Sequence, residues 1–283
     1  MFSLKPPKGS KRLTLAAAVL AAVLLSGIEF NAPSIPFFGL GSSGFESVFH
    51  TAADKTVNSA VKKKVSVKPA AKPLLEVVDQ SDILPKHRQI ADRVLRALPG
   101  KCRDSLQSFY VTYDKSGSRG LGGESVIILS GNVPDAEFAA LLVHECGHVV
   151  DIGGIRGSLD SGRTGFYDGN TPIFGNDLSL AFYQISWITP SIIHPGSTEK
   201  DFVSGYAMSD PFEDFAETFA YFALQQKEFK RIAEKNPALK AKYDFMANYV
   251  FNAGYSVAVG KHVRGKSAPW DVTKLPYVWI AKI

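Results

Sequence analysis

The spacing of hydrophobic positions predicts a helix and two strands in the middle of the chain. Residues 81–98 carry apolar side chains three and four positions apart, as an amphipathic helix does, and Pro99 ends the pattern. Residues 108–113 alternate between apolar and polar side chains, which is the period of a strand, and 125–129 form a second strand-like run. The glycine-rich stretch 120–123 before the second run allows another backbone to approach closely.

Two further helices are expected downstream, separated by a long segment rich in turn residues. The first starts near Pro134, and the second starts after Asp210 with phenylalanines and alanines that leave almost no polar face, so it is expected to be buried. Residues 153–204 between them are expected to be mostly loop. Residues 225–251 continue as helix with a break at an Asn-Pro pair. The order helix, strands, helix, long loop, helix predicts an α+β fold.

The N-terminus has the pattern of an export signal. A basic stretch without acidic residues, 1–12, precedes the apolar run 13–28. This run is short compared with the about 20 residues of a comfortable membrane span, and no clear cleavage signal follows it. Residues 1–30 are therefore expected to be a removed signal peptide or an uncleaved anchor in the cytoplasmic membrane, with the anchor slightly favoured. In both cases the rest of the chain is exported.

Charge and composition separate a linker from the domain. Residues 31–75 are rich in Pro, Gly, Ser and Lys and are expected to form an extended linker before a domain at 76–283. Residues 1–75 hold ten of the 32 basic and three of the 27 acidic residues, so 22 basic and 24 acidic residues remain for the domain. The net charge of +5 therefore belongs to the tail, and we expect no nucleic acid as a partner.

The two cysteines of the chain, Cys102 and Cys146, are too few for a disulfide framework. One bridge between them would suit an oxidising compartment, but buried free thiols are the favoured interpretation. Because Cys146 lies two residues after His144, it is expected to point away from the helix face that carries His144.

The candidate chemistry is concentrated in the motif HECGH, from His144 to His148. Residues four apart on a helix share one face, so the two histidines are expected to hold one metal ion between them. Neutral imidazole suits zinc, and this spacing with Glu145 beside the first histidine is the zincin pattern, in which the glutamate is the general base. The alternative is a pair of core histidines with a buried glutamate, which would be costly without a cation nearby.

The buried helix after Asp210 offers the third protein ligand that a catalytic zinc ion requires. Asp210 or Ser209 can cap this helix, and acidic residues suit its first turn. Glu213 and Glu217 share one face of it, in an apolar setting where a carboxylate needs a partner. We expect Glu213 to bind the metal and Glu217 to accept a hydrogen bond from a ligand histidine. A solvated acidic patch at the helix start is the alternative.

These motifs together resemble one metallopeptidase family. The motif HECGHVVD, followed downstream by a tyrosine and then by Glu-Asp-Phe-Ala-Glu, is similar to the anthrax lethal factor-like zinc metallopeptidases, which include the secreted Pro-Pro endopeptidases. Asp151, at the end of the first motif, agrees with this resemblance, which covers roughly residues 122–222. The connection 153–204 is expected to differ and to shape the substrate cleft, so the substrate preference of the family does not carry over.

The resemblance implies a zincin-like fold and a role for each motif residue. The implied roles are zinc ligands for His144, His148 and Glu213, general base for Glu145, hydrogen-bond donor to the oxyanion for Tyr206, and support of a ligand for Glu217. The resemblance also implies that the strand before the HECGH helix, near Val126–Leu129, is a sheet edge that pairs with an extended substrate.

The favoured function is therefore a zinc-dependent endopeptidase that acts on protein or peptide substrates outside the cytoplasmic membrane. One alternative is a non-catalytic surface binding module held together by zinc, which would need a fourth ligand or no base; the presence of Glu145 counts against it. A second alternative is a zinc amidase that acts on cell-wall peptides, for which the sequence shows no dedicated pocket.

Overall fold

The computed structural model describes residues 72–114, 117–252 and 255–281. The segment 1–30, expected to be a signal or an anchor, and nearly all of the expected linker 31–75 lie outside the described residues. Within the described part of the chain, no helix has the length and apolar character needed to cross a membrane.

The first part of the domain forms the helix and the strands that the sequence predicts. Its elements are α2 (Pro85–Ala97), α3 (Gly100–Ser105), β1 (Ser108–Thr112), β2 (Gly120–Gly122) and β3 (Val126–Ser130). α2 begins later than predicted because Pro85, with its fixed φ and no N–H to donate, suits the first helical position. The predictions for β1 and β3 are confirmed within a residue at each end.

The three strands form one sheet in the order β1-β3-β2, with β3 in the centre. β1 is parallel to β3, and β2 is antiparallel to it. The expectation that residues 126–129 form a sheet edge is therefore wrong. The glycine-rich stretch that precedes β3 folds back on it as β2, and the edge strand on this side of the sheet is Gly120–Gly122.

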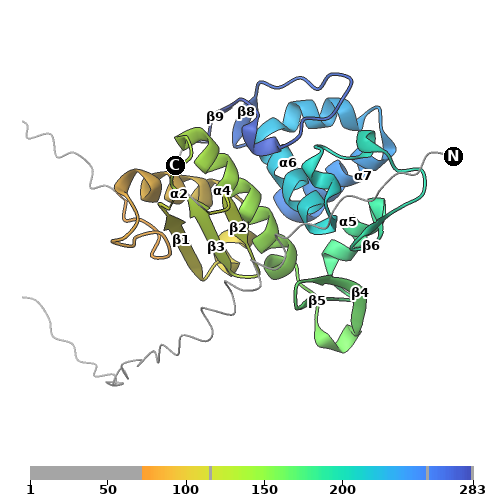
Figure 1. Ribbon diagram of the computed structural model, residues 1–283, viewed down its shortest axis with the longest axis horizontal. Helices are drawn as coiled ribbons and strands as arrows, with labels where there is room; N and C mark the ends of the chain where they lie inside the picture. Colours follow the sequence, from red (N-terminus) through yellow and green to blue (C-terminus); the bar gives the residue numbers. More distant parts are fainter. Residues whose placement is uncertain (1–71, 115–116, 253–254, 282–283) are drawn as a thin grey trace, which may run out of the picture. The chain divides into compact units, whose positions relative to one another are not determined.

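The core lies on both sides of α4 (Asp135–Val149), the helix with the HECGH motif. Figure 1 shows α4 between the sheet and α6 (Pro211–Ala233), and α4 contacts α2, β2, β3 and α6. Apart from its first turn and His148, most of α4 is buried. The buried character predicted for α6 is confirmed, because its phenylalanines and alanines are buried. These helices and sheets confirm the α+β class.

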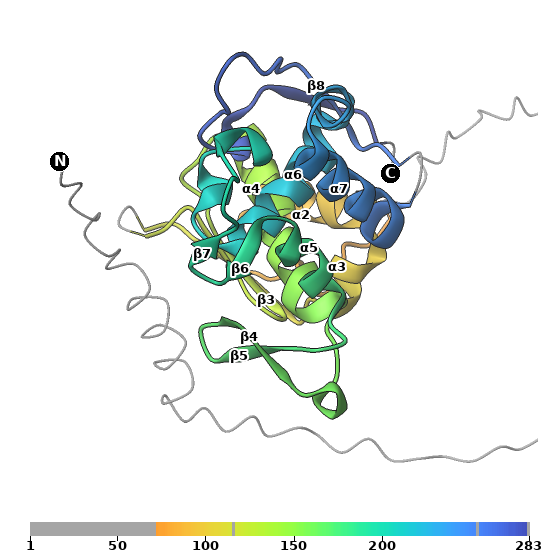
Figure 2. The same cartoon turned by 90° about the vertical axis from the view of Figure 1, so that its right-hand side faces the viewer.

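The connection between α4 and α6 contains more regular structure than predicted. Its elements are η1 (Val150–Gly154), η2 (Leu159–Ser161), β4 (Arg163–Asp168), β5 (Thr171–Phe174), α5 (Leu178–Ser186), β6 (Trp187–Thr189), β7 (Ile192–Ile193), η3 (Glu199–Asp201) and η4 (Tyr206–Met208). The hairpin β4–β5 extends from the rest of the domain in Figure 2, and its turn contains Gly169 with φ +56°. α5 begins where the Asp177 side chain accepts a hydrogen bond from Ser179 N. The elements are too short to leave a periodic hydrophobic pattern.

The C-terminal part covers α6. Its elements are α7 (Pro237–Phe245), η5 (Met246–Phe251), β8 (Ala258–Gly260), η6 (Val272–Lys274) and β9 (Tyr277–Trp279). The predicted helix break is confirmed: the side chain of Asn236 caps α7 by accepting from Leu239 N. α6 is kinked at Gln225, whose side chain donates to Pro276 O and so ties the helix to the chain before β9.

A disulfide joins Cys102 of α3 to Cys146 of α4, with 5.4 Å between the two Cα atoms. The prediction of free buried thiols is therefore wrong. The two cysteines are 44 positions apart, and only the packing of α3 on α4 reveals that their side chains face each other. The expected direction of Cys146, away from the face of His144, is confirmed.

Candidate metal centre

Two helices bring three possible metal ligands to one point. The ligand atoms of His144 and His148, from α4, and of Glu213, from α6, all lie within 4.8 Å of one another. Glu213 Oε2 lies 3.2 Å from His144 Nε2 and 3.5 Å from His148 Nε2. This oxygen is buried and has no hydrogen-bond partner. A cation among the three atoms would satisfy it, and two imidazoles with one carboxylate suit zinc.

The spacing within α4 and its contact with α6 produce this geometry. The two histidines are four residues apart and therefore lie one turn above each other. Gly147, between them, packs against Ala216: a Cβ atom at this position would lie 2.7 Å from Ala216 Cα. The glycine thus lets the two helices approach closely, which brings Glu213 within reach of both histidines. Sequence reasoning missed this role, although the glycine inside the motif was visible.

The start of α6 fixes the position of the Glu213 carboxylate. Asp210 caps the helix, because its Oδ1 accepts hydrogen bonds from Phe212 N at 2.9 Å and from Glu213 N at 2.8 Å. Pro211 occupies the first helical position, where its missing N–H has no cost. The first turn is therefore held in one conformation, and Glu213 points from it toward α4.

Glu217, one turn further along α6, contacts His144. His144 Nδ1 donates to Glu217 Oε1 at 2.9 Å, which leaves Nε2 to face Glu213. The second carboxylate oxygen of Glu217 accepts from Ser204 Oγ and from Val272 N. Both oxygens of this fully buried carboxylate are therefore satisfied, and His144 is held in the orientation that metal binding requires.

The two histidines and Glu213 shift one another's pKa values. Burial alone would lower the pKa of His148, but the Glu213 carboxylate raises it to about 9. Burial alone would raise the pKa of Glu213, but His148 and His144 hold it well below its usual range. Burial alone would likewise lower the pKa of His144, but the nearby Glu213 carboxylate and the hydrogen bond to Glu217 raise it. The carboxylates therefore favour positive charge at this point, as a metal site must.

Glu145 lies beside the three residues and under β2. Ideal Cβ atoms placed on Gly120 and Gly122 would collide with its carboxylate, and the one on Gly122 would also lie 2.9 Å from His148 Cβ. The glycines therefore make room for Glu145 between the strand and α4. Burial raises the pKa of this carboxyl group. The sequence indicated a close backbone approach at these glycines but not the side chain that they accommodate.

Tyr206 lies on the other side of the Glu213 carboxylate. Its hydroxyl donates to Glu213 Oε1 at 2.9 Å, while Oε2 faces the histidines. Its ring centroid is 6.2 Å from that of His144. η4, which contains Tyr206, ends three residues before α6 begins, so the chain brings the phenol to the site directly.

Two nearby acidic residues have other partners. Asp151 is buried, and its Oδ1 accepts from the Tyr183 hydroxyl at 2.7 Å. Asp214, next to Glu213, forms an ion pair with Lys242 at 2.7 Å and accepts from Trp187 Nε1. Neither belongs to the metal-ligand group of the described residues.

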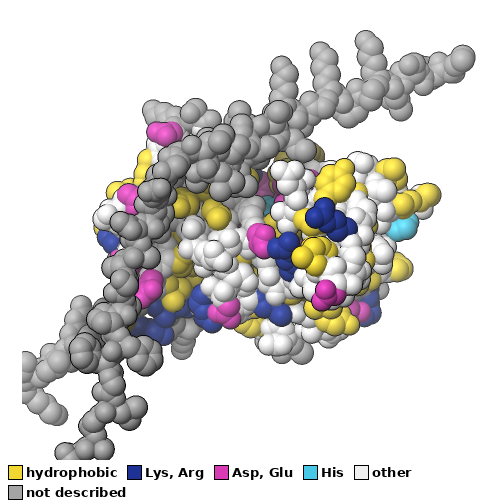
Figure 3. Space-filling model, turned by 90° about the horizontal axis from the view of Figure 1, so that it is seen from below, with side chains coloured by type: hydrophobic (Ala, Val, Ile, Leu, Met, Phe, Trp, Pro, Cys, Tyr) yellow, Lys and Arg dark blue, Asp and Glu magenta, His cyan; other side chains and the backbone are white. Residues whose placement is uncertain are grey.

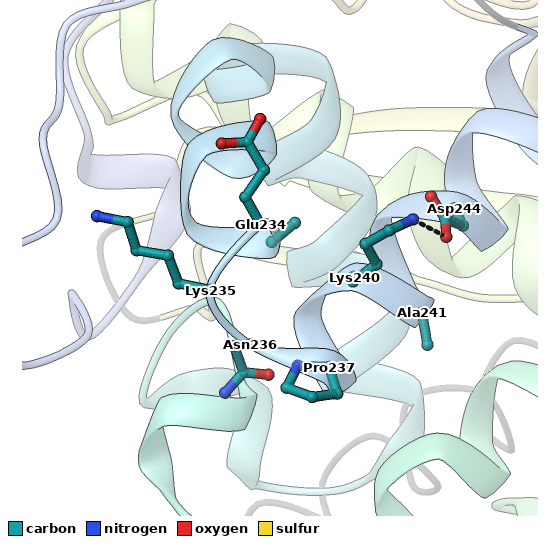
Figure 4. A pocket seen from close by; sticks show the side chains of 8 residues that line it. Glu234, Lys235, Asn236, Pro237, Lys240, Ala241 and Asp244 are labelled. Atoms are coloured by element: carbon teal, nitrogen blue, oxygen red, sulfur yellow. Dashed lines mark hydrogen bonds and ion pairs between the residues drawn. The ribbon is translucent and has the colours of Figure 1, made fainter.

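Other parts of the described surface are weaker candidates for a functional site. A shallow pocket of about 550 Å³ lies where α6 ends and α7 begins, and Figure 4 shows Glu234 and Lys235 at its rim pointing in different directions. On the face shown in Figure 3, basic side chains lie beside acidic ones with hydrophobic side chains among them. The convergence of titratable groups at His144, His148 and Glu213 is therefore the best candidate site.

Comparisons of the chain with models of known protein families, with curated proteins and with solved structures found no match. The geometry of the site therefore has to support the functional assignment. The side chains of His144, His148 and Glu213 meet around one point. The Glu145 carboxylate lies beside them against the glycines of β2, and the Tyr206 hydroxyl contacts Glu213 from the other side.

Proposed function

We propose that the protein is a zinc-dependent endopeptidase with a zincin-like domain that acts outside the cytoplasmic membrane. The observation that supports it most is the meeting of His144, His148 and Glu213 around a buried carboxylate oxygen without a hydrogen-bond partner. Glu145 and Tyr206 flank this point, as a general base and an oxyanion donor would. The Cys102–Cys146 disulfide also supports export, because disulfides persist in oxidising compartments.

Each side chain has a distinct part in the proposed hydrolysis. When bound, zinc supplies Lewis-acid chemistry, which polarises a water molecule and the scissile carbonyl. Glu145 takes a proton from the attacking water and gives it to the leaving amine. Tyr206 donates a hydrogen bond to the oxyanion of the tetrahedral intermediate. To do so, its hydroxyl gives up the hydrogen bond that it donates to Glu213 Oε1. Glu217 holds His144 in place throughout.

The substrate is proposed to pair with β2 rather than with β3. Arg119 O accepts from Ser130 N and Gly123 N donates to Val126 O, so these residues of the β2 segment face β3. Bonded positions alternate along an antiparallel pair, which leaves the N–H and C=O groups of Gly120 and Gly122 facing the open edge. Ser118 Oγ donates to Gly120 O, a side-chain contact that a substrate N–H could replace. An extended peptide paired here would lie directly beside Glu145.

The test is a comparison of the parent protein with Glu145→Gln. We expect both to bind about one zinc ion, because Glu145 is not a ligand in this proposal. We expect only the parent to cleave a mixed peptide library, in a reaction that a chelator abolishes. Metal analysis and mass spectrometry of the products measure the two properties. Full hydrolysis by the Gln variant would refute the mechanism, and zinc binding without hydrolysis by the parent would favour a non-catalytic binding module.

A further inference from the structure

Trp270 is a large apolar side chain that lies exposed beside the candidate site. It is 72% exposed, and its ring centroid is 6.5 Å from that of Tyr206. Since the Tyr206 ring is in turn 6.2 Å from that of His144, Trp270 is one ring removed from the proposed ligands. Burying an exposed indole against a partner stabilises a complex more than burying most other side chains.

The backbone around Trp270 is held firmly although the side chain is exposed. Pro269 O accepts from Gly205 N at 2.8 Å, and Trp270 O accepts from Tyr206 N at 2.8 Å. Two residues further on, Val272 N donates to Glu217. The indole rests on Gly205, where a Cβ atom would come within 2.6 Å of Trp270 Cε3. The ring is thus presented from a fixed backbone, so little conformational entropy would be lost when a ligand covers it.

Trp270 also lies near the Gly120 end of β2, the strand that we propose to pair with the substrate. Arg119, immediately before Gly120 of β2, forms an ion pair with Asp271, immediately after Trp270. Arg119 also donates to Thr273 Oγ1 at 3.1 Å and to Glu137 on α4. A peptide along the open edge of β2 would therefore reach the indole at the Gly120 end. The ion pair next to the indole balances its own charge, so the ring offers an apolar surface.

We propose that Trp270 determines substrate specificity by binding a bulky apolar side chain, with aromatic rings preferred, near the scissile bond. This inference rests on the proposed peptidase function and names a substrate class for it. Aromatic rings are preferred because they stack on indole beyond the gain from simple burial. A charged substrate residue at this position would lose hydration without gaining a counter-charge.

Binding without turnover provides the first test. An immobilised random peptide library is incubated with the zinc-loaded Glu145→Gln protein, and bound peptides are sequenced. We expect aromatic residues to be enriched at one position by about tenfold. We expect Trp270→Ala in the same background to lose the enrichment and Trp270→Phe to retain part of it. Tyr249→Ala is the matched control, because Tyr249 is 53% exposed in η5 and contacts Phe245 instead of the site.

Cleavage of the same library by proteins with an intact Glu145 separates this inference from the proposed function. Loss of aromatic enrichment in Trp270→Ala supports peptide binding at Trp270 even if the protein with an intact Glu145 cleaves nothing. In that case the peptidase function is refuted and only the binding role of Trp270 remains. The inference is overturned if Trp270→Ala leaves the aromatic enrichment or the cleavage profile unchanged. It is also overturned if the Glu145→Gln protein with Trp270 intact shows no aromatic enrichment. Melting temperature and zinc content show whether the Ala variant is folded; if it is not, the reduced enrichment expected for Trp270→Phe decides.

Discussion

Small residues determine the geometry of the candidate site as much as the titratable ones do. Gly147 lets α4 approach α6, and Gly120 and Gly122 let β2 approach Glu145. A methyl group at any of these positions would displace a ligand-bearing helix or the proposed base. At the scale of single residues, the site therefore depends on where side chains are missing.

We expect Gly147→Ala to weaken zinc binding by about 10- to 100-fold, the range seen when contacts behind metal ligands are disturbed. The added Cβ would meet Ala216 Cα and push α6, with Glu213, away from the two histidines. Intrinsic helix propensity favours alanine by about 1 kcal/mol, so the protein should still fold. Competition with a chelator measures the affinity. Gly165→Ala is the control, since a Cβ there meets no atom within 4 Å. Equal affinity in both variants would disprove the role of Gly147.

Tyr206→Phe tests the proposed oxyanion donor, because only the hydroxyl is lost. That hydroxyl contacts Glu213 Oε1, whereas Oε2 faces the histidines, so zinc content should stay close to that of the parent. An interaction made only in the transition state affects kcat more than binding, and one lost oxyanion donor typically costs on the order of 10²–10³ in rate. We expect kcat to fall at least about tenfold, a conservative bound on this range. An unchanged kcat in the zinc-loaded variant would remove Tyr206 from the mechanism.

At the scale of elements, α7 supports the start of α6, which carries Glu213. Lys242 of α7 forms an ion pair with Asp214, and both side chains are fully buried. The ammonium group also donates to Asp201 O and lies 4.0 Å from the centre of the Phe202 ring. Because Asp214 adjoins Glu213, this pair anchors the first turn of α6 on a different face from the one that carries Glu213.

We expect Lys242→Met to reduce the free energy of unfolding by about 3–5 kcal/mol, because it leaves Asp214 charged and buried without its cation. Combining it with Asp214→Asn should recover part of the loss, since the amide keeps an acceptor for Trp187 Nε1 and carries no charge. Urea denaturation measures both variants. The control is Lys240→Met in the same helix, whose ion pair with Asp244 is exposed and should contribute less than about 1 kcal/mol. A similar loss in Lys240→Met would contradict the special role of Lys242.

The sequence is informative where a pattern is local and long. The helical period alone places His144 and His148 on one face of α4, and Glu213 and Glu217 on one face of α6. Pairing between distant segments is not accessible in this way: alternation identifies β3 but does not show that Gly120–Gly122 covers its edge. The short hairpins of 153–204 have too few residues to display a period.

Contacts across the chain set the remaining features of the site. Glu217 accepts hydrogen bonds from Ser204 and Val272, and Asp214 pairs with Lys242. The local sequence around these three partners does not indicate that they contact the acidic residues. Their importance follows only from the fold, which buries the acidic residues and so requires partners for them.

At the scale of the whole domain, contacts between segments that are distant in the sequence connect the sheet with α6. The segment after Trp270 reaches Arg119 at the start of β2 through Asp271 and reaches Glu217 through Val272. The disulfide adds a covalent link behind α4, on the side away from the proposed metal ligands. The contacts and the disulfide should therefore have separable effects, one on the site and one on global stability.

We expect replacement of Cys102 and Cys146 by alanine to lower stability while leaving zinc binding intact. Closing a loop of 44 residues restricts the unfolded chain, and the loop-entropy relation gives about 4 kcal/mol for this length. For a domain of this size, that loss corresponds to a decrease in melting temperature of about 8–16 °C. The ligands should stay in place because the contact of α4 with α6, rather than α3, positions them. Thermal unfolding of the parent with and without a reductant, and of the double variant, measures the first effect, and metal analysis measures the second. A parent whose melting temperature is insensitive to the reductant would show that the bridge contributes no stability, and loss of zinc from the folded double variant would show that α3 does position the site.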